Sequence, residues 1–505
     1  MASRGTTDLA PGGGAPTPAP AEPGPGPGSA APPGEPARAR SDRRWLVALL
    51  LICALGLALR VGYVLGWQQI ADDELGGDAF YYHAAANLLA DGEGFVHPFF
   101  WEEGIRAPGA DHPPAYQVVL ALPSLLGFDS VRDHQVFSCL LGTVTVGLAG
   151  VAGRQIAGRR AGLIAAGVTA LYPNIWMNDA AVMSETLALL CGVVVVICAY
   201  RAWKRPDWRW FAATGAAIGL ASLARAEGLM LVPLVVWPLA AWARGLDGWR
   251  VRLGRLALGT GVAALVVAPW VLYNLARFEE PATLSTQLGP TLDVANCEET
   301  YYGRALGAWS FACASDPEVP NADRSTIDKQ LRDEAIEYAR DHLDRLPVVV
   351  AARFGRAWAL YDPFEQLKFD RFAEARPLGA SRAGLAAYYV VAAGAVAGMV
   401  VLRRRGTPSF PLVAGLLNVA ATVVLFYGST RFRAPAEPSL VLLAAVAADA
   451  ALARRWPGRA EGARASEPVD GAEPSSADGA AAPDGPPAGG PTSPVAGPAP
   501  GPAAP

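Results

Sequence analysis

The chain of 505 residues has little charge: 17% of its residues are charged, against about 25% in an ordinary soluble domain. Lysine is nearly absent, occurring only at positions 204, 329 and 368, and the formal net charge is −4. Because the chain has no basic excess, we expect no nucleic-acid partner. The scarcity of charge, together with a hydrophobic share of 52%, disfavours a soluble enzyme and predicts a membrane protein in the lipid bilayer.

The two ends of the chain lack the residues that build a hydrophobic core. Residues 1–40 and 457–505 are dominated by Ala, Pro and Gly, so both are predicted to be disordered tails. The first tail contains no apolar h-region, and we therefore do not expect it to be a secretory signal peptide. The remaining residues, 41–456, are rich in apolar runs.

These apolar runs predict an all-α polytopic membrane protein with about ten transmembrane helices. Several runs are shorter than the ~20 residues of an untilted span. Segments 115–127 and 347–361 are candidates for additional or re-entrant helices. The ten runs are 45–66, 134–152, 161–176, 186–200, 210–224, 229–243, 255–275, 384–402, 409–428 and 435–452.

Arginine and lysine recur in every second short loop, which predicts that both termini are cytoplasmic and that the protein is a multi-pass plasma-membrane protein. The alternation also places two long segments outside, residues 67–133 and 276–383. The predicted organisation is a transmembrane module at 41–275 containing the first outer loop, then the large extracytoplasmic loop, then C-terminal helices at 384–456. All five His lie on the outer side, so we expect the active site there.

Two of the six cysteines lie in the large outer loop. Cys297 and Cys313 would be in an oxidising compartment, and a disulfide between them is predicted, with two free thiols as the alternative. The other four lie in predicted spans, where a thiol behaves as a small apolar side chain.

Several polar residues of the outer segments have a structural explanation beside a functional one. Asp78 begins a short helix within 76–94, which is predicted to lie on the membrane surface, and there it serves equally as a helix cap. His112 follows Asp111 and precedes two prolines, a pattern that a turn explains. Ser184 and Glu185 begin the fourth span, where a cap and the helix dipole account for both.

Arginines on the outer side are harder to explain, because they oppose the bias that keeps positive charge inside. Arg225 joins two spans, and Arg431 and Arg433 join the last two. Internal ion pairs are one explanation. Arg433 and Glu437 have the i,i+4 spacing of a helix, whereas Arg225 and Glu227 are two residues apart and do not face each other on a helix. The other explanation is an anionic ligand.

The order and sidedness of these motifs resemble the GT-C membrane glycosyltransferases. They are most similar to the glycosyltransferase family 39 group, which includes protein mannosyltransferases and lipid A aminoarabinose transferases, in its actinobacterial form. The resemblance covers roughly residues 41–456. Many relatives have two adjacent acids in the first loop, whereas Ala79 follows Asp78 here, so a divalent metal is possible and no cofactor is certain. The motifs are GlyAspAlaPheTyrTyr (77–82), HisProPro (112–114), SerGlu (184–185), ArgAlaGluGly (225–228), ProTrpXxxXxxTyrAsn (269–274), the segment 296–309 and the terminal ArgPheArg (431–433).

The resemblance implies a GT-C-like bundle and a hexosyl- or pentosyltransferase. Such an enzyme takes a sugar from a polyprenyl-phosphate donor and passes it, with inversion, to an extracytoplasmic acceptor that is a lipid, a glycan or a protein. One carboxylate suffices as general base, because phosphate leaves as a stable anion without a general acid. The resemblance assigns Asp78 as this base. It implies substrate binding by Tyr82, His112, Glu185, Arg225, Glu227, Arg431 and Arg433.

A multi-span transporter or flippase of a lipid-linked or anionic substrate is the alternative function. Its coupling acids and broken helices would lie in the middle of the membrane, in two repeated halves. The position of the polar cluster along the helices therefore discriminates between the two functions.

Overall fold

The computed structural model describes residues 35–66, 75–315 and 323–455. Within these ranges the chain is helical without a regular strand, and a single antiparallel bridge joins Val96 to Pro108. The two tails predicted to be disordered lie outside the described residues, except that the first helix already begins at Glu35.

Six helices of the described ranges are long and apolar enough to cross a membrane. The other expected spans are helical too, which confirms the all-α polytopic architecture. The six are α1 (Glu35–Gly66), α5 (Val131–Ala157), α8 (Glu185–Lys204), α11 (Trp249–Leu275), α17 (Leu378–Arg404) and α19 (Glu437–Arg455), which is preceded by η5 (Thr430–Ala436). The shorter ones are α6 (Arg159–Leu171), α9 (Trp208–Ala224) and α18 (Phe410–Leu425).

The sixth expected span is broken into three pieces. Residues 226–242 form the 3-10 turn η2 (Ala226–Met230), the π-helical turn η3 (Val232–Val236) and α10 (Trp237–Trp242). Pro233 and Pro238 lack backbone N–H donors, which disfavours a regular α-helix over these residues.

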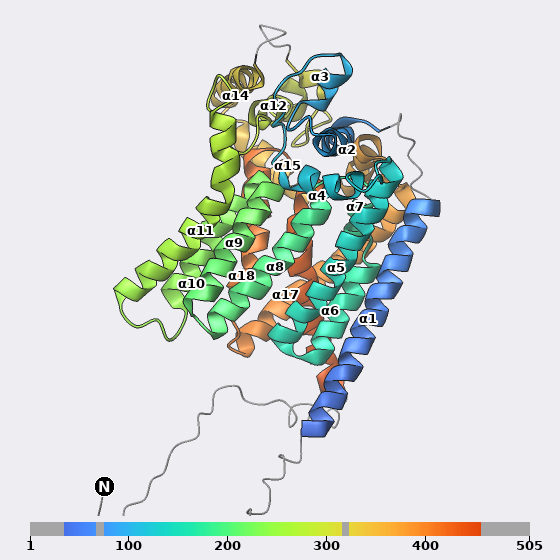
Figure 1. Cartoon of the computed structure of the whole chain (residues 1–505), viewed down its shortest axis with the longest axis vertical. Coiled ribbons are helices and arrows are strands. Elements are labelled where there is room, and N and C mark those ends of the chain that lie inside the picture. Colours follow the sequence, from blue (N-terminus) through green and yellow to red (C-terminus); the bar gives the residue numbers. More distant parts are fainter. Residues whose placement is uncertain (1–34, 67–74, 316–322, 456–505) are drawn as a thin grey trace, which may run out of the picture. The chain divides into compact units, whose positions relative to one another are not determined.

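The long connections gather at one end of the helical bundle, which we call the loop end (Figure 1). The helices at the loop end are α2 (Gly77–Ala90), α3 (Pro98–Glu102), α4 (Ala115–Ser124), α7 (Pro173–Asp179), α12 (Leu288–Asp293), α13 (Glu298–Tyr301), η4 (Phe311–Cys313), α14 (Arg324–Asp341), α15 (Leu346–Ala357) and α16 (Pro363–Glu374). The short helix expected within 76–94 is α2. Of the two candidate extra helices, 115–127 contains α4 and 347–361 overlaps α15.

The opposite end of the bundle, which we call the basic end, is held together by arginines. Asp42 of α1 accepts hydrogen bonds from Arg154 at 2.6 Å and from Arg159 at 2.8 Å. Arg160 donates to Asp449 at 2.6 Å, which joins α6 to α19. The arginines of the short loops are therefore at the end far from the long loops.

The structure contradicts the cap expected at Asp78. Asp78 is the second residue of α2, Gly76 is the N-cap, and no side chain caps this helix. In α14, Asp323 is the N-cap and accepts from Ser325 N at 2.9 Å. Asp328 of α14 accepts from Gly289 N at 2.6 Å, and a Cβ at Gly289 would lie 1.9 Å from the backbone oxygen of Asp328.

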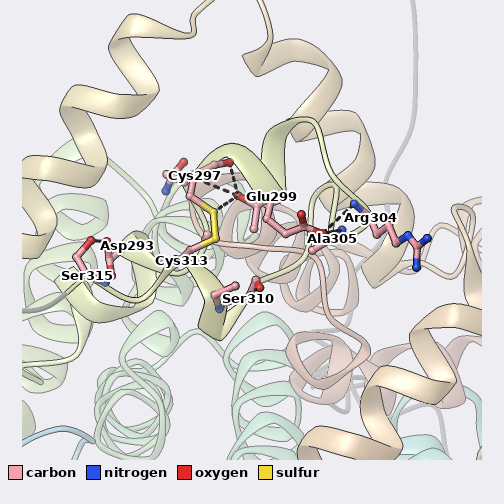
Figure 2. The surroundings of a disulfide bond; sticks show 12 residues. Asp293, Cys297, Glu299, Arg304, Ala305, Ser310, Cys313 and Ser315 are labelled. Atoms are coloured by element: carbon pink, nitrogen blue, oxygen red, sulfur yellow. Dashed lines mark hydrogen bonds between the residues drawn. A yellow bond between two sulfur atoms is a disulfide. The ribbon is translucent and has the colours of Figure 1, made fainter.

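Cys297 and Cys313 form the predicted disulfide, with their Cα atoms 5.9 Å apart (Figure 2). Gly428, in the hairpin before η5, donates its N–H to Gly307 O at 2.7 Å. Trp309 packs against Tyr427 of the same hairpin. The disulfide loop thus supports the segment that leads into Arg431. The other four cysteines are free thiols.

Candidate active site

Asp78 lies at the loop end, and its carboxylate contacts the side chains of His112 and Arg431. His112 Nε2 lies 3.3 Å from Oδ1, and Arg431 Nη1 lies 2.7 Å from Oδ2. Burial by itself would raise the pKa of Asp78, but Arg431 and His112 outweigh burial and hold this pKa well below the ordinary range. The Asp78 side chain is nevertheless 31% exposed, so its carboxylate is ionised and open to a ligand.

Glu185 links the two arginines of this cluster. It is the first residue of α8 and is 1% exposed. It follows the N-cap residue Ser184, whose side chain makes no capping hydrogen bond. Glu185 Oε1 accepts from Arg225 Nη1 at 2.6 Å and also from Arg431 Nε. Arg431, at the start of η5, therefore bridges the carboxylates of Asp78 and Glu185.

Arg225 and Glu227 pair at 2.5 Å, although their spacing argued against a pair on a helix. The expectation is wrong because Arg225 is not helical: it has φ −149° and ψ 125° between α9 and η2. The rule for i,i+2 residues on a helix therefore does not apply to Arg225. The guanidinium of Arg225 is thus held between Glu227 and Glu185.

Arg433 is the predicted site residue that the structure does not bring to Asp78. It donates to Glu437 at 2.7 Å, the i,i+4 pair expected from the spacing, and to Ala357 O at 3.0 Å. Its guanidinium lies 3.8 Å from the ring centroid of Tyr388. Arg431 and Arg433, although only two residues apart, therefore lie in different environments.

Tyr82 orients His112 from the buried side. Its ring stacks on the imidazole, with centroids 4.7 Å apart and an interplanar angle of 23°, and the residue is 1% exposed. Burial raises the pKa of Tyr82 well above its ordinary value, so its phenol stays neutral.

Sequence reasoning missed two neighbours of this cluster. Val182 has φ 52°, a strained left-handed conformation for a β-branched residue, and packs in the same core as Tyr82. Burial raises the pKa of Tyr427 to about 12, and the charges of Arg431 and Asp78 act on this phenol. A left-handed valine leaves no sequence signal, whereas Tyr427 lies four residues before a suspected site arginine.

A mainly apolar pocket begins at Arg225 and Glu227 and extends into the bundle, and its empty volume of about 550 Å³ includes space open to solvent. Arg225 and Glu227 line one part of it, and the rest is lined mainly by apolar residues of α8, η2, η3 and α18. Gly192 and Val196 are two of these residues, and they lie two and three turns into α8. The cavity therefore combines charged groups near the loop end with an apolar interior.

In the described arrangement the carboxylates of this cluster are paired with neighbouring side chains. Asp78 contacts His112 and Arg431, and Oε1 of Glu185 contacts Arg225 and Arg431. Among the described residues, no group of three His, Cys, Asp or Glu side chains is placed to hold a metal ion.

Comparison with known proteins gives one family match. Residues 111–273 match the model of the dolichyl-phosphate-mannose-protein mannosyltransferases, and no curated protein matches the chain. The matched range includes His112, Glu185, Arg225 and Glu227.

Three solved structures are similar to this chain at low identity. The first is the Archaeoglobus fulgidus oligosaccharyltransferase AglB in complex with an inhibitory peptide and a dolichol-phosphate, with 15% identity over 86% of this chain and 52% of that chain and a TM-score of 0.49. The second is the same organism's oligosaccharyltransferase in complex with Zn and sulfate, with 15% identity over 83% of this chain and 50% of that chain and a TM-score of 0.48. The third is ArnT from Cupriavidus metallidurans bound to undecaprenyl phosphate, with 17% identity over 83% of this chain and 80% of that chain and a TM-score of 0.35. The chain spans about half the length of the archaeal enzymes. Through its family match at residues 111–273, the chain resembles the GT-C membrane glycosyltransferases of the protein mannosyltransferase group.

Proposed function

We propose that this chain transfers a sugar, with inversion, from a polyprenyl-phosphate donor to an acceptor on the extracytoplasmic side of the membrane. One observation carries the proposal: Arg225 lines an apolar pocket of the bundle, and Glu185 joins it to Arg431, which pairs with the ionised carboxylate of Asp78. A lipid-linked phosphate has the same two parts, an anionic head and an apolar chain. Pockets that bind such ligands are mostly apolar with a few placed polar groups.

The arginines bind the donor phosphate in this proposal. Guanidinium groups match phosphate with paired N–H bonds, and Arg225 already lines the cavity. Two arginines face the three carboxylates of Asp78, Glu185 and Glu227, so a phosphate must displace a carboxylate from an arginine. His112 Nε2 lies 3.3 Å from Asp78 Oδ1, so in this proposal it positions the base.

Displacement of Asp78 from Arg431 then prepares the base. While the two are paired, the guanidinium keeps the pKa of Asp78 low and the carboxylate weakly basic. When the donor phosphate takes over Arg431, this pKa rises and Asp78 accepts the proton of the acceptor hydroxyl as that oxygen attacks the anomeric carbon. The bond from the anomeric carbon to the phosphate oxygen breaks, and the phosphate departs with the electron pair.

The loop end is the extracytoplasmic side in this proposal. The short loops of the basic end carry the arginines, and positive residues are retained in the cytoplasm. The polar cluster lies at helix ends: Glu185 begins α8, Arg225 follows α9, and Arg431 precedes α19. This position favours a transferase over a transporter, which would hold its coupling groups in mid-membrane.

A donor panel tests the proposal. Purified protein in lipid nanodiscs is incubated with polyprenyl-phosphate-linked hexoses and pentoses, each with a hydroxyl-bearing peptide, a lipid-linked glycan or a phospholipid as acceptor. We expect one donor to release polyprenyl phosphate and give a product of inverted anomeric configuration. Donor that crosses a vesicle membrane without cleavage would instead identify a transporter. Failure of every donor to be cleaved, although polyprenyl phosphate binds, would refute the transferase.

A further inference from the structure

A second buried cluster of polar groups lies next to the candidate site, around Asp111. This residue is 7% exposed, and both carboxylate oxygens have partners. Oδ2 accepts from His97 Nε2 and from Arg324 Nη2, each at 3.0 Å. Oδ1 accepts from the Thr286 hydroxyl at 3.0 Å, and the backbone N–H of Asp111 donates to the Tyr81 hydroxyl at 3.2 Å.

The partners of Asp111 come from both long connections. His97 and Tyr81 belong to the first, residues 75–130, whereas Thr286 and Arg324 belong to the large loop region, residues 276–377. Arg324 is the first residue of α14. Asp111 therefore binds an element far away in the chain, and it does so with a largely buried charge.

Two hydrogen bonds to backbone carbonyls of the first connection strengthen this junction. The backbone N–H of Thr286 donates to Ala110 O at 2.8 Å. Arg277 Nη2 donates to Gly109 O at 2.7 Å. Three consecutive residues of the first connection, 109–111, are thus held by the large loop region.

The next residue in the chain is His112, which contacts Asp78. Tyr81 completes the link, because its ring packs edge-on against His97 at 5.7 Å and against His112 at 5.0 Å. A shift of the large loop region therefore moves Asp111. The movement reaches His112, which contacts the Asp78 carboxylate, through the peptide bond between Asp111 and His112 and through the ring of Tyr81.

We propose that Asp111 is a positioning residue for sugar transfer: it couples the seating of the large loop region to the placement of His112 and Asp78. The proposal rests on the proposed function. Asp111 contacts neither Arg225 nor Arg431 in the described structure, so it does not belong to the phosphate site. Its loss is expected to lower turnover without weakening the binding of polyprenyl phosphate.

A double-mutant cycle with His112 tests the coupling. Asp111→Asn keeps the shape but removes the charge that Arg324 binds, and a misplacement of about 1 Å costs on the order of 100-fold in rate. We expect Asp111→Asn to lower kcat roughly 10- to 100-fold, with an unchanged Kd for polyprenyl phosphate. In a His112→Ala background the same change should cost less than about twofold, because the effects of coupled residues are not additive. Equal losses in both backgrounds would overturn the inference.

Asp328 supplies a matched control. It is also 7% exposed, lies on α14, and accepts from Gly289 N–H and from Arg332 within the large loop region. Asp328→Asn removes a similar buried charge without a link to His112, so its kcat should stay within about threefold of wild type. If Asp111→Asn does not fold, Arg324→Gln removes the same ion pair from the side that is 19% exposed.

Chemical labelling provides a readout that does not depend on activity. Diethyl pyrocarbonate modification of His112 is measured by mass spectrometry, with His83 as the internal reference. His83 lies on α2 like Asp78, but its ring packs against His134. We expect Asp111→Asn to raise the labelling of His112 several-fold, whereas Asp328→Asn leaves it unchanged. Wild-type labelling in Asp111→Asn would overturn the coupling. If wild-type protein cleaves no donor, the proposed function fails, and the labelling still decides whether Asp111 positions His112.

Discussion

Asp78→Asn is the substitution that most directly separates a base from a structural carboxylate. Asp78 caps no helix, so an amide at this position leaves the N-terminus of α2 intact. The amide cannot accept a proton from the acceptor hydroxyl, and it removes the negative charge that lies 2.7 Å from Arg431. The two losses act on different steps of the reaction, which makes them separable.

The structure sets the size of each effect. Loss of a general base lowers kcat by about 100- to 10,000-fold. The pair of Asp78 with Arg431 is partly exposed, at 31% for the Asp78 side chain, so its loss changes the free energy of unfolding by only about 1 kcal/mol. Because Arg431 loses a competing carboxylate but keeps Glu185, its affinity for the donor phosphate should stay the same or rise.

The assay measures kcat by release of polyprenyl phosphate, and the Kd for polyprenyl phosphate by a binding titration on the same preparation. Asp91→Asn is the matched control, since Asp91 is the exposed C-cap of the same helix and makes the same change from acid to amide. The reasoning is refuted if Asp78→Asn retains a kcat within about threefold of wild type. It is also refuted if polyprenyl phosphate no longer binds, because Asp78 would then be part of the phosphate site.

Arg431→Lys should lower kcat/KM nearly as much as Arg431→Ala, because an ammonium cannot span Asp78 and Glu185. Loss of one charged hydrogen bond costs about 1.5–3 kcal/mol, which corresponds to a roughly 10- to 100-fold lower kcat/KM. Steady-state kinetics that match wild type would place the phosphate elsewhere. Gly192→Leu introduces a side chain into the apolar cavity and should raise the KM of a long-chain donor about tenfold, but not that of a two-isoprene analogue. An equal effect on both donors would argue against a lipid site. Cys313→Ser opens a loop with a sequence separation of 16 and should cost about 3 kcal/mol, seen as a lower Tm in nanodiscs; reductant should reproduce the loss in wild type and leave the variant unchanged.

Local patterns were enough to predict the helical, membrane-spanning character of this chain. Apolar runs and alternating arginines depend only on neighbouring residues and on the bilayer, so the positions of α5, α8 and α17 follow from hydropathy. The i,i+4 pair of Arg433 with Glu437 also follows from helix periodicity. Local rules failed at Arg225, where a single extended residue allows its pair with Glu227.

By itself the sequence determined the class of fold, the candidate polar residues and the disulfide, because hydrophobicity, charge and cysteine number are properties of short segments. Only the tertiary structure decided how these residues combine. Asp78 and Arg431 are 353 positions apart, and their 2.7 Å contact depends on where the surrounding helices place α2 and η5. Tertiary placement likewise leaves Arg433 paired with Glu437 and joins Asp111 to Arg324. Such contacts are set by side-chain geometry across distant helices, and no local pattern in the sequence records them.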